Sequence, residues 1–162
     1  LWQTGLSRQR LAEIGLALGA DVPVFVRGFN AFAEGVGESL TPVELPAACY
    51  LVIEPGVQVP TAAIFGAPQL KRDTPAIAAR EWRPGEGQND LEPVVCAGFP
   101  AVAAALAWLR GRNPAALMTG SGACVFAPFA TRAAAERVLS DMPAGLVGWL
   151  ADGLSAHPLA GF

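Results

Sequence analysis

The stretch "LGADVPVFVRGFNAFAEGVGE" (Leu18–Glu38) decides how the first third of the chain folds. An acidic residue, Asp21, stands in it between a Gly-Ala pair and the apolar run Val22–Val26. Asp is common in turns because its carboxylate accepts hydrogen bonds from nearby backbone N–H groups. A carboxylate held at the mouth of an apolar segment can also act as a base. The local sequence leaves both interpretations open.

The residues on either side of this acid predict the local elements. Apolar spacings of three and four indicate a helix over 6–18. The apolar segments Val24–Arg27 and Ala31–Glu34 are typical of two strands joined by a Gly-Phe-Asn turn. Gly35 and Gly37 interrupt the second strand, which indicates a bulge or a close approach of two backbone segments.

The sequence after Pro46 predicts a second domain. We expect strands at 49–54, 117–118, 123–127 and 146–150, and helices at 61–65, 75–82, 99–109, 131–139 and after Asn89 or Asp90, either of which can cap a helix. This order fits an antiparallel or mixed sheet with helices packed on one face. We therefore predict an α/β (α+β) chain of two parts, with residues 1–47 in the first and 48–162 in the second.

Composition excludes several classes of partner. The chain has 162 residues, of which 52% are hydrophobic and 15% charged, and its net charge is −3. It carries no basic stripe, so we expect no nucleic-acid partner. The apolar run Phe99–Leu109 is too short to span a bilayer, so we expect no membrane partner.

Cys49, Cys96 and Cys124 are spaced like neither a metal site nor a disulfide framework, which favours a reducing cytoplasm and predicts no metal site.

The stretch "MTGSGACVF" (Met118–Phe126) predicts a glycine-rich loop between two short apolar segments. Gly120 and Gly122 flank Ser121, and such a loop can bind an anion through its backbone N–H groups. A tight β-hairpin also needs glycine, so this alternative stays open. The loop lacks the Gly-Lys-Ser/Thr of a Walker A motif and the Gly-x-Ser-x-Gly of a hydrolase, which argues against both classes.

The stretch "PGVQVPTAAIF" (Pro55–Phe65) ends a strand and begins a short helix. Thr61 and Phe65 lie four residues apart, so they share one face of that helix. The Phe65 ring can stack on a planar ligand or pack into the core, and the second is the commoner fate of Phe.

Together with "QNDLEPVV" (Gln88–Val95), these stretches resemble the 4-diphosphocytidyl-2-C-methyl-D-erythritol kinase family of the GHMP superfamily, over nearly the whole chain. The resemblance implies a two-domain α/β fold with the active site between the domains. It also implies transfer of the γ-phosphate of ATP to the C2 hydroxyl of a cytidine diphosphate-linked methylerythritol, in non-mevalonate isoprenoid synthesis. ATP and Mg²⁺ are the implied cofactors, with the main elements that bind them absent from this chain. A small molecule is the implied partner, and the cytoplasm is the implied location.

The resemblance also implies roles for individual residues. Asp21 matches the family's catalytic aspartate, which accepts or orients the proton of the substrate hydroxyl, and a turn position is compatible with that role. The loop Gly120–Ser121–Gly122 matches the third superfamily motif, which lies beside the phosphates. Val36, Thr61 and Phe65 fall where the family lines the cytidine pocket, with Phe65 near the base.

Two features of the family have no counterpart here. These are an N-terminal lysine paired with the aspartate and a long Gly/Ser-rich phosphate loop, since the only lysine is Lys71, in a polar segment. We therefore expect the chain to be the later part of a longer protein and to be inactive alone. The apolar faces of 1–46 would lack partners, which predicts self-association, partial disorder or a homodimer. A non-enzymatic small-molecule-binding α/β module and a structural or interaction domain are the alternatives.

Overall fold

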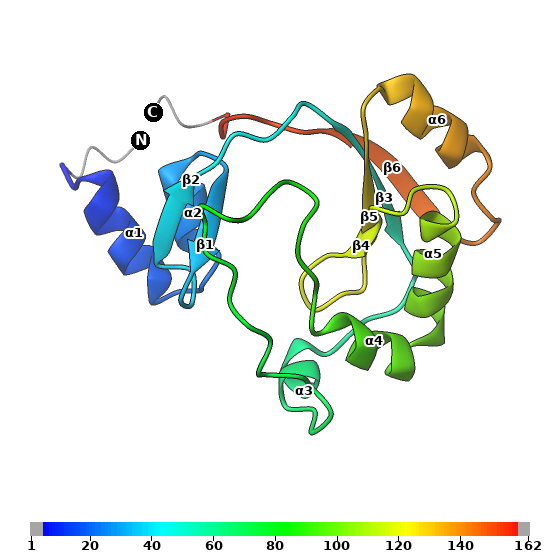
Figure 1. Cartoon of the computed structure of the whole chain (residues 1–162), viewed down its shortest axis with the longest axis horizontal. Helices are drawn as coiled ribbons and strands as arrows, with labels where there is room; N and C mark the ends of the chain where they lie inside the picture. The colour runs from blue at the N-terminus through cyan, green and yellow to red at the C-terminus, as the bar shows by residue number, and fades with distance from the viewer. Residues whose placement is uncertain (1–4, 159–162) are drawn as a thin grey trace. The chain divides into compact units, whose positions relative to one another are not determined.

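The computed structural model describes residues 5–158, which divide into two compact units. The larger unit is residues 48–153, and the smaller one combines residues 5–47 with the chain after Gly153 (Figure 1). Every helix in 5–158 is too short or too polar to cross a bilayer. The assignment of 1–47 and 48–162 to the two domains of a GHMP kinase stays a prediction.

The larger unit is built on an antiparallel sheet with the strand order β4-β5-β3-β6. Its strands are β3 (Cys49–Glu54), β4 (Leu117–Met118), β5 (Val125–Phe129) and β6 (Val147–Asp152). The central strand β3 sets the register, because Leu51 pairs with Ala127 on one side and with Leu150 on the other. Cys49, Leu51 and Ile53 are buried while the residues between them are only half-buried, so one face of the sheet forms the core.

Helices α5 (Pro100–Arg110) and α6 (Arg132–Ser140) pack on the sheet, and α4 (Glu92–Gly98) packs against α5 (Figure 1). A shorter helix, α3 (Thr61–Phe65), adds the buried Ile64 to the same core. The largest fully buried side chains of this unit are Leu51, Ile53, Val95, Val102, Leu109 and Val125. They come from β3, β5, α4 and α5, so the core lies between the sheet and these helices. The prediction of an antiparallel sheet with helices on one face is confirmed.

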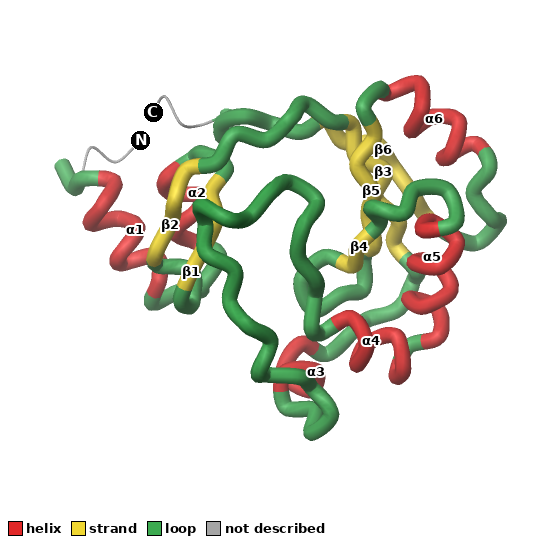
Figure 2. The backbone as a smooth tube through the Cα atoms, viewed as in Figure 1, coloured by secondary structure: helices red, strands yellow, loops and turns green. Residues whose placement is uncertain are grey.

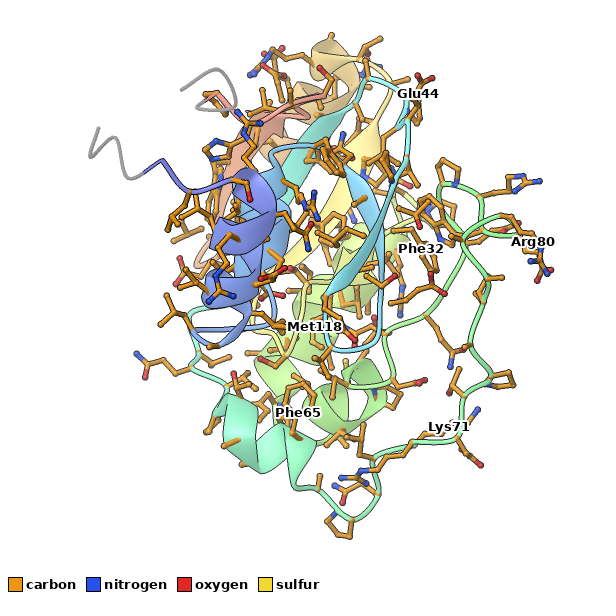
Figure 3. All side chains as sticks on the ribbon, turned by 90° about the vertical axis from the view of Figure 1, so that its left-hand side faces the viewer. Phe32, Glu44, Phe65, Lys71, Arg80 and Met118 are labelled. Carbon is orange, nitrogen blue, oxygen red and sulfur yellow. The ribbon has the colours of Figure 1, made fainter. Side chains whose placement is uncertain are left out.

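A long irregular segment separates α3 from α4 (Figure 2). The prediction of a short helix over 75–82 is wrong, because this stretch forms only a single turn near Arg80. A helix of eight residues gains few hydrogen bonds against the cost of nucleation, and this stretch buries none of its residues. Lys71 and Arg80 both stand on this segment (Figure 3).

The smaller unit contains a helix pair and a hairpin. Its elements are α1 (Arg8–Leu16), α2 (Val22–Arg27), β1 (Ala31–Glu34) and β2 (Ser39–Pro42). The chain after Gly153 joins this unit through two hydrogen bonds. Asn30 Nδ2 donates to the Leu154 carbonyl at 3.0 Å, and His157 N–H donates to the Gly28 carbonyl at 2.9 Å.

The prediction of a strand at Val24–Arg27 is wrong, because these residues belong to α2. Pro23 lies in the first turn of α2, where its missing N–H costs nothing. Gly28 ends the helix with φ of 76°, and its N–H donates to the Val24 carbonyl. A short run of apolar residues has no periodicity of its own, so these two flanking residues decide between helix and strand.

Gly35 and Gly37 do not form a bulge. They lie in the turn between β1 and β2, whose register pairs Glu34 with Ser39. The expected close approach of two backbone segments is present at Gly37, where a Cβ would overlap the Ala20 carbonyl oxygen. The hairpin turn therefore rests against the residue that precedes Asp21.

The smaller unit buries little apolar surface. Within its described residues, Ala12 and Pro23 are the buried apolar side chains. Its exposed large hydrophobic side chains are Leu6, Leu11, Ile14, Leu18, Phe25, Val36, Leu45 and Leu154. Such a surface is typical of a face that another chain segment or molecule covers. Self-association, partial disorder and a homodimer stay predictions.

Candidate functional site

Thr61 and Ser121 meet in the larger unit, although 60 residues separate them in the sequence. Thr61 Oγ1 lies 2.7 Å from Ser121 Oγ, and either hydroxyl can be the donor. Thr61 begins α3, and Ser121 lies in the glycine-rich loop between β4 and β5. The structure therefore brings together two of the predicted site segments.

Phe65 lies on the same helix as Thr61, one turn further along (Figure 3). Its side chain is 55% exposed, whereas its neighbour Ile64 is buried in the core. Phe65 is therefore not a core residue, and its ring is available to stack on a planar ligand.

Arg72 fixes the end of this helix. Its guanidinium donates to the carbonyl oxygens of Phe65 at 2.6 Å and Leu70 at 3.0 Å, with two longer bonds to Ala67. The last carbonyls of a helix have no partner within the helix, so a nearby arginine can satisfy them. Arg72 thus holds the backbone of Phe65 in place, and the sequence analysis did not identify this role.

The glycine-rich loop is tightly packed at Gly122. This residue has φ of 87°, which favours glycine, and a Cβ there would lie 3.1 Å from Met118 Sδ. Its N–H donates to the Thr119 carbonyl at 2.9 Å, which closes a turn around Ser121. Burial raises the pKa of the Cys124 thiol just beyond the loop, so this thiol is not activated as a nucleophile.

Asp21 lies in the smaller unit, in helical conformation directly before α2. Its side chain is exposed and makes no capping hydrogen bond to that helix. The carboxylate therefore does not serve the local turn in the way that a capping Asp does.

Val36 lies in the same unit, on the tip of the hairpin, and is 69% exposed. Its N–H donates to Glu38 Oε2 at 2.7 Å, which orders the tip. Because Gly37 packs against the Ala20 carbonyl, the hairpin tip and the turn before α2 lie side by side.

Asn89 does more than the sequence analysis expected. Its Oδ1 accepts from the Leu91 N–H at 3.0 Å, as a residue at a helix start does. Its Nδ2 also donates to the carbonyl oxygens of Met118 and Gly120 at 3.1 and 2.7 Å. The second role could not be found from sequence spacing, because it joins segments 29 and 31 residues apart.

No dedicated metal centre occurs in residues 5–158. This part of the chain holds no group of three or more His, Cys, Asp or Glu side chains with the geometry to bind a metal ion.

Comparison with known proteins gives consistent matches. Residues 73–148 match the family described as "GHMP kinases C terminal". The chain is 63% identical over 160 residues to the 4-diphosphocytidyl-2-C-methyl-D-erythritol kinase of Dechloromonas aromatica, covering 99% of this chain and 58% of that protein. It is 56% identical over 162 residues to the protein of the same name from Thiobacillus denitrificans, covering 100% and 58%.

A solved structure agrees with these matches. The crystal structure of a 4-(cytidine 5'-diphospho)-2C-methyl-D-erythritol kinase superposes with a TM-score of 0.72 at 30% identity, over 93% of this chain and 58% of that one. The chain thus spans 58% of the length of each of these relatives. The chain is thus similar in sequence and in fold to 4-diphosphocytidyl-2-C-methyl-D-erythritol kinases, and its residues 73–148 match the C-terminal family of the GHMP kinases.

Proposed function

We propose that the whole protein uses ATP to phosphorylate the C2 hydroxyl of 4-diphosphocytidyl-2-C-methyl-D-erythritol, in the synthesis of isoprenoid precursors. The names of the relatives support this substrate, since they are called 4-diphosphocytidyl-2-C-methyl-D-erythritol kinases. This chain would supply part of the substrate pocket, one phosphate-proximal loop and the catalytic carboxylate. Its location in the cytoplasm stays a prediction.

The observation that carries the proposal is the 2.7 Å contact between Thr61 and Ser121. It joins the helix proposed for the cytidine pocket to the loop proposed to lie beside the phosphates. The proposed substrate links a cytidine to a diphosphate, so it needs both kinds of contact within the length of one ligand. The exposed Phe65 ring suits stacking on the pyrimidine. Val36 keeps a proposed role in binding the cytidine, which rests on the family resemblance.

Asp21 has the properties that a proton acceptor requires. Its carboxylate is exposed and is not engaged in capping α2, so it can accept the proton of the substrate hydroxyl or orient that hydroxyl. A positioned base contributes about 10²- to 10⁴-fold in rate.

ATP use follows from the match to the GHMP kinases. Phosphoryl transfer depends on positioning and on stabilising the charge spread over the phosphate oxygens. The backbone N–H groups of Gly120, Ser121 and Gly122 are the groups of this chain proposed to contact those oxygens. We propose that Mg²⁺ accompanies the ATP, as the family resemblance implies, with the main elements that bind both supplied outside this chain.

The test is a phosphorylation assay on the whole protein with ATP and the cytidine diphosphate-linked methylerythritol, followed by ³¹P NMR. We expect a new phosphate monoester on the substrate and release of ADP. D21N should lower kcat by about 10²- to 10⁴-fold. D141N is the matched control, because Asp141 is an exposed carboxylate at the end of α6.

The 162-residue chain alone should turn over no ATP above background. Binding of the substrate by the whole protein without any transfer of phosphate would favour a small-molecule-binding module instead. Equal activity of D21N and D141N would refute the role of Asp21.

A further inference from the structure

Asn89 connects the start of α4 to the segment that leads into the glycine-rich loop. Its acceptor, Oδ1, is used by the Leu91 N–H, which fixes the side chain relative to α4. Its donor, Nδ2, reaches the carbonyl oxygens of Met118 and Gly120, one on each side of Thr119. The side-chain amide of Asn89 therefore binds the start of α4 and also two backbone carbonyls of the segment that leads into the loop.

These carbonyls lie on the outer edge of the sheet. The strand β4 ends the strand order, and its inner side pairs with β5 at Leu117↔Phe126 and Met118↔Val125. The pairing continues at Thr119, whose N–H donates to the Cys124 carbonyl at 3.0 Å. Successive residues of a strand direct their backbone groups to opposite sides, so the carbonyls of Ala116 and Met118 face away from β5. The Gly120 carbonyl follows in the turn, where φ is 52°.

Side chains of α4 and α5 take the place of a further strand along this edge. Glu92 Oε2 accepts from the Met118 N–H at 3.5 Å, and Arg110 Nε donates to the Ala116 carbonyl at 3.1 Å. Arg110 and Glu92 are joined by an ion pair of 2.8 Å, in which the Glu92 side chain is only 15% exposed. Asn89, Glu92 and Arg110 thus line the outer edge of β4.

We infer that Asn89 is a positioning residue of the kinase, which holds the glycine-rich loop in the conformation that contacts the phosphates. This inference rests on the proposed function. Glycines give a loop many accessible conformations, so a loop that must place N–H groups accurately needs support from outside. Asn89 provides this support where the chain passes from β4 into the loop, and Thr61 contacts Ser121 at the tip.

Two variants separate the donor of Asn89 from its acceptor. N89D keeps the size of the side chain and an oxygen for the Leu91 N–H, but it removes both bonds to the loop segment. N89S also keeps an acceptor at this position and adds no charge, so it decides the outcome if N89D does not fold.

The chain offers a matched control at Asn113. Its Oδ1 accepts from the Ala115 N–H at 3.0 Å and its Nδ2 donates to the Pro128 carbonyl at 2.6 Å. This is the same arrangement with one donated bond instead of two, made to the far end of β5 instead of the segment of the glycine-rich loop. N113D therefore measures the cost of losing such a bond elsewhere in the unit.

We expect N89D and N89S to lower kcat of the whole protein by about 10- to 100-fold, because small misplacements of binding groups have effects of this size. The KM for the cytidyl substrate should change little, and N113D should keep the wild-type kcat. In the whole protein, hydrogen exchange at the Gly122 N–H, which closes the turn around Ser121, should become faster in both Asn89 variants and stay unchanged in N113D.

A folded N89S variant with wild-type kcat and wild-type exchange at Gly122 would overturn the inference while leaving the kinase activity intact. Equal losses of kcat in N113D and N89S would also overturn it, since the effect would then be one of general stability. If the wild-type whole protein phosphorylates nothing, the proposed function fails, and exchange at Gly122 alone decides whether Asn89 holds the loop.

Discussion

The hydroxyl groups of Thr61 and Ser121 lie 2.7 Å apart, so the helix that carries Phe65 and the glycine-rich loop are joined by a direct hydrogen bond. Each residue belongs to a different stretch of the family resemblance. Under the proposed function, one end of the bond lies at the nucleoside and the other at the phosphates. The two halves of the substrate site should therefore be energetically coupled.

A double-mutant cycle with T61V and S121A measures this coupling. We expect each single variant to lower kcat/KM of the whole protein. Expressed as a free-energy change, the loss in the double variant should be smaller than the sum of the losses in the two single variants. The coupling energy should be about 0.5–1.5 kcal/mol, the net value of one hydrogen bond. T61V combined with S140A is the control, because the Ser140 hydroxyl bonds only to the Arg137 carbonyl of its own helix. Additive effects in both cycles would show that the contact does not couple the sites.

Loss of Arg72 should loosen α3. In R72A the carbonyl oxygens of Phe65 and Leu70 lose their donor, so the Gly66 N–H, which bonds to the Ala62 carbonyl, should exchange faster. The expected change is about 0.5–1.5 kcal/mol in the free energy of local opening. Hydrogen exchange followed by NMR on the 162-residue chain measures it.

The control for this prediction is R112A. Arg112 donates to the Trp108 carbonyl at 3.2 Å, so it supports the end of α5 as Arg72 supports the end of α3. R112A should therefore speed exchange in the last turn of α5 and leave Gly66 unchanged. If both variants affect Gly66 equally, Arg72 has no specific role at the helix of Phe65.

A substitution at Gly37 should disturb the turn before Asp21. In G37A the new Cβ overlaps the Ala20 carbonyl oxygen, and φ of 108° is unfavourable for alanine. The conformational term alone is about 1–2 kcal/mol, and the overlap adds to it because a backbone atom has to move. G56A is the control. It should lose stability only through the unfavourable backbone conformation, because φ is 73° and no atom lies within 4 Å of its Cβ. Urea denaturation should show the larger loss for G37A, and equal losses would contradict the close approach.

The larger unit could be predicted well from the sequence because its patterns are regular. Leu51 and Ile53 alternate with less buried residues along β3, and Val102, Leu106 and Leu109 repeat at helical spacing on α5. These periods follow from strand and helix geometry alone. The prediction at Val24–Arg27 failed because an unbroken apolar run has no period, and the signals that mattered were Pro23 before it and Gly28 after it.

The candidate site could be predicted in its parts but not in its assembly. Glycines around Ser121 and a helix face with Thr61 and Phe65 are visible in the sequence. The Thr61–Ser121 bond and the bonds of Asn89 to the loop segment depend on how α3 and α4 pack beside β4, which no local pattern specifies. Residues that act through tertiary contacts are the ones that sequence analysis missed.

The free energy of unfolding should fall at alkaline pH because of Cys49, which is 4% exposed at the start of β3. Burial raises the pKa of this thiol above its ordinary value of 9.0. The positive charge of Arg132 lowers the pKa, and the negative charge of Asp152, the cross-strand partner of Cys49, raises it. The folded state therefore keeps the proton to higher pH than the unfolded chain does. The stabilisation is complete below the unfolded pKa and is lost as pH rises through the folded pKa.

The measurement compares wild type with C49A by urea denaturation between about pH 8 and pH 10.5, on either side of the ordinary thiol pKa. C49A should be less stable at the lower pH, because it loses core contacts, and the difference between the two proteins should shrink as the pH rises. L51A is the control, since it loses about 2–5 kcal/mol from the same strand without removing a titrating group. Its difference from wild type should be the same at both ends of the range. A constant difference for C49A as well would mean that burial does not shift the Cys49 thiol in the folded state.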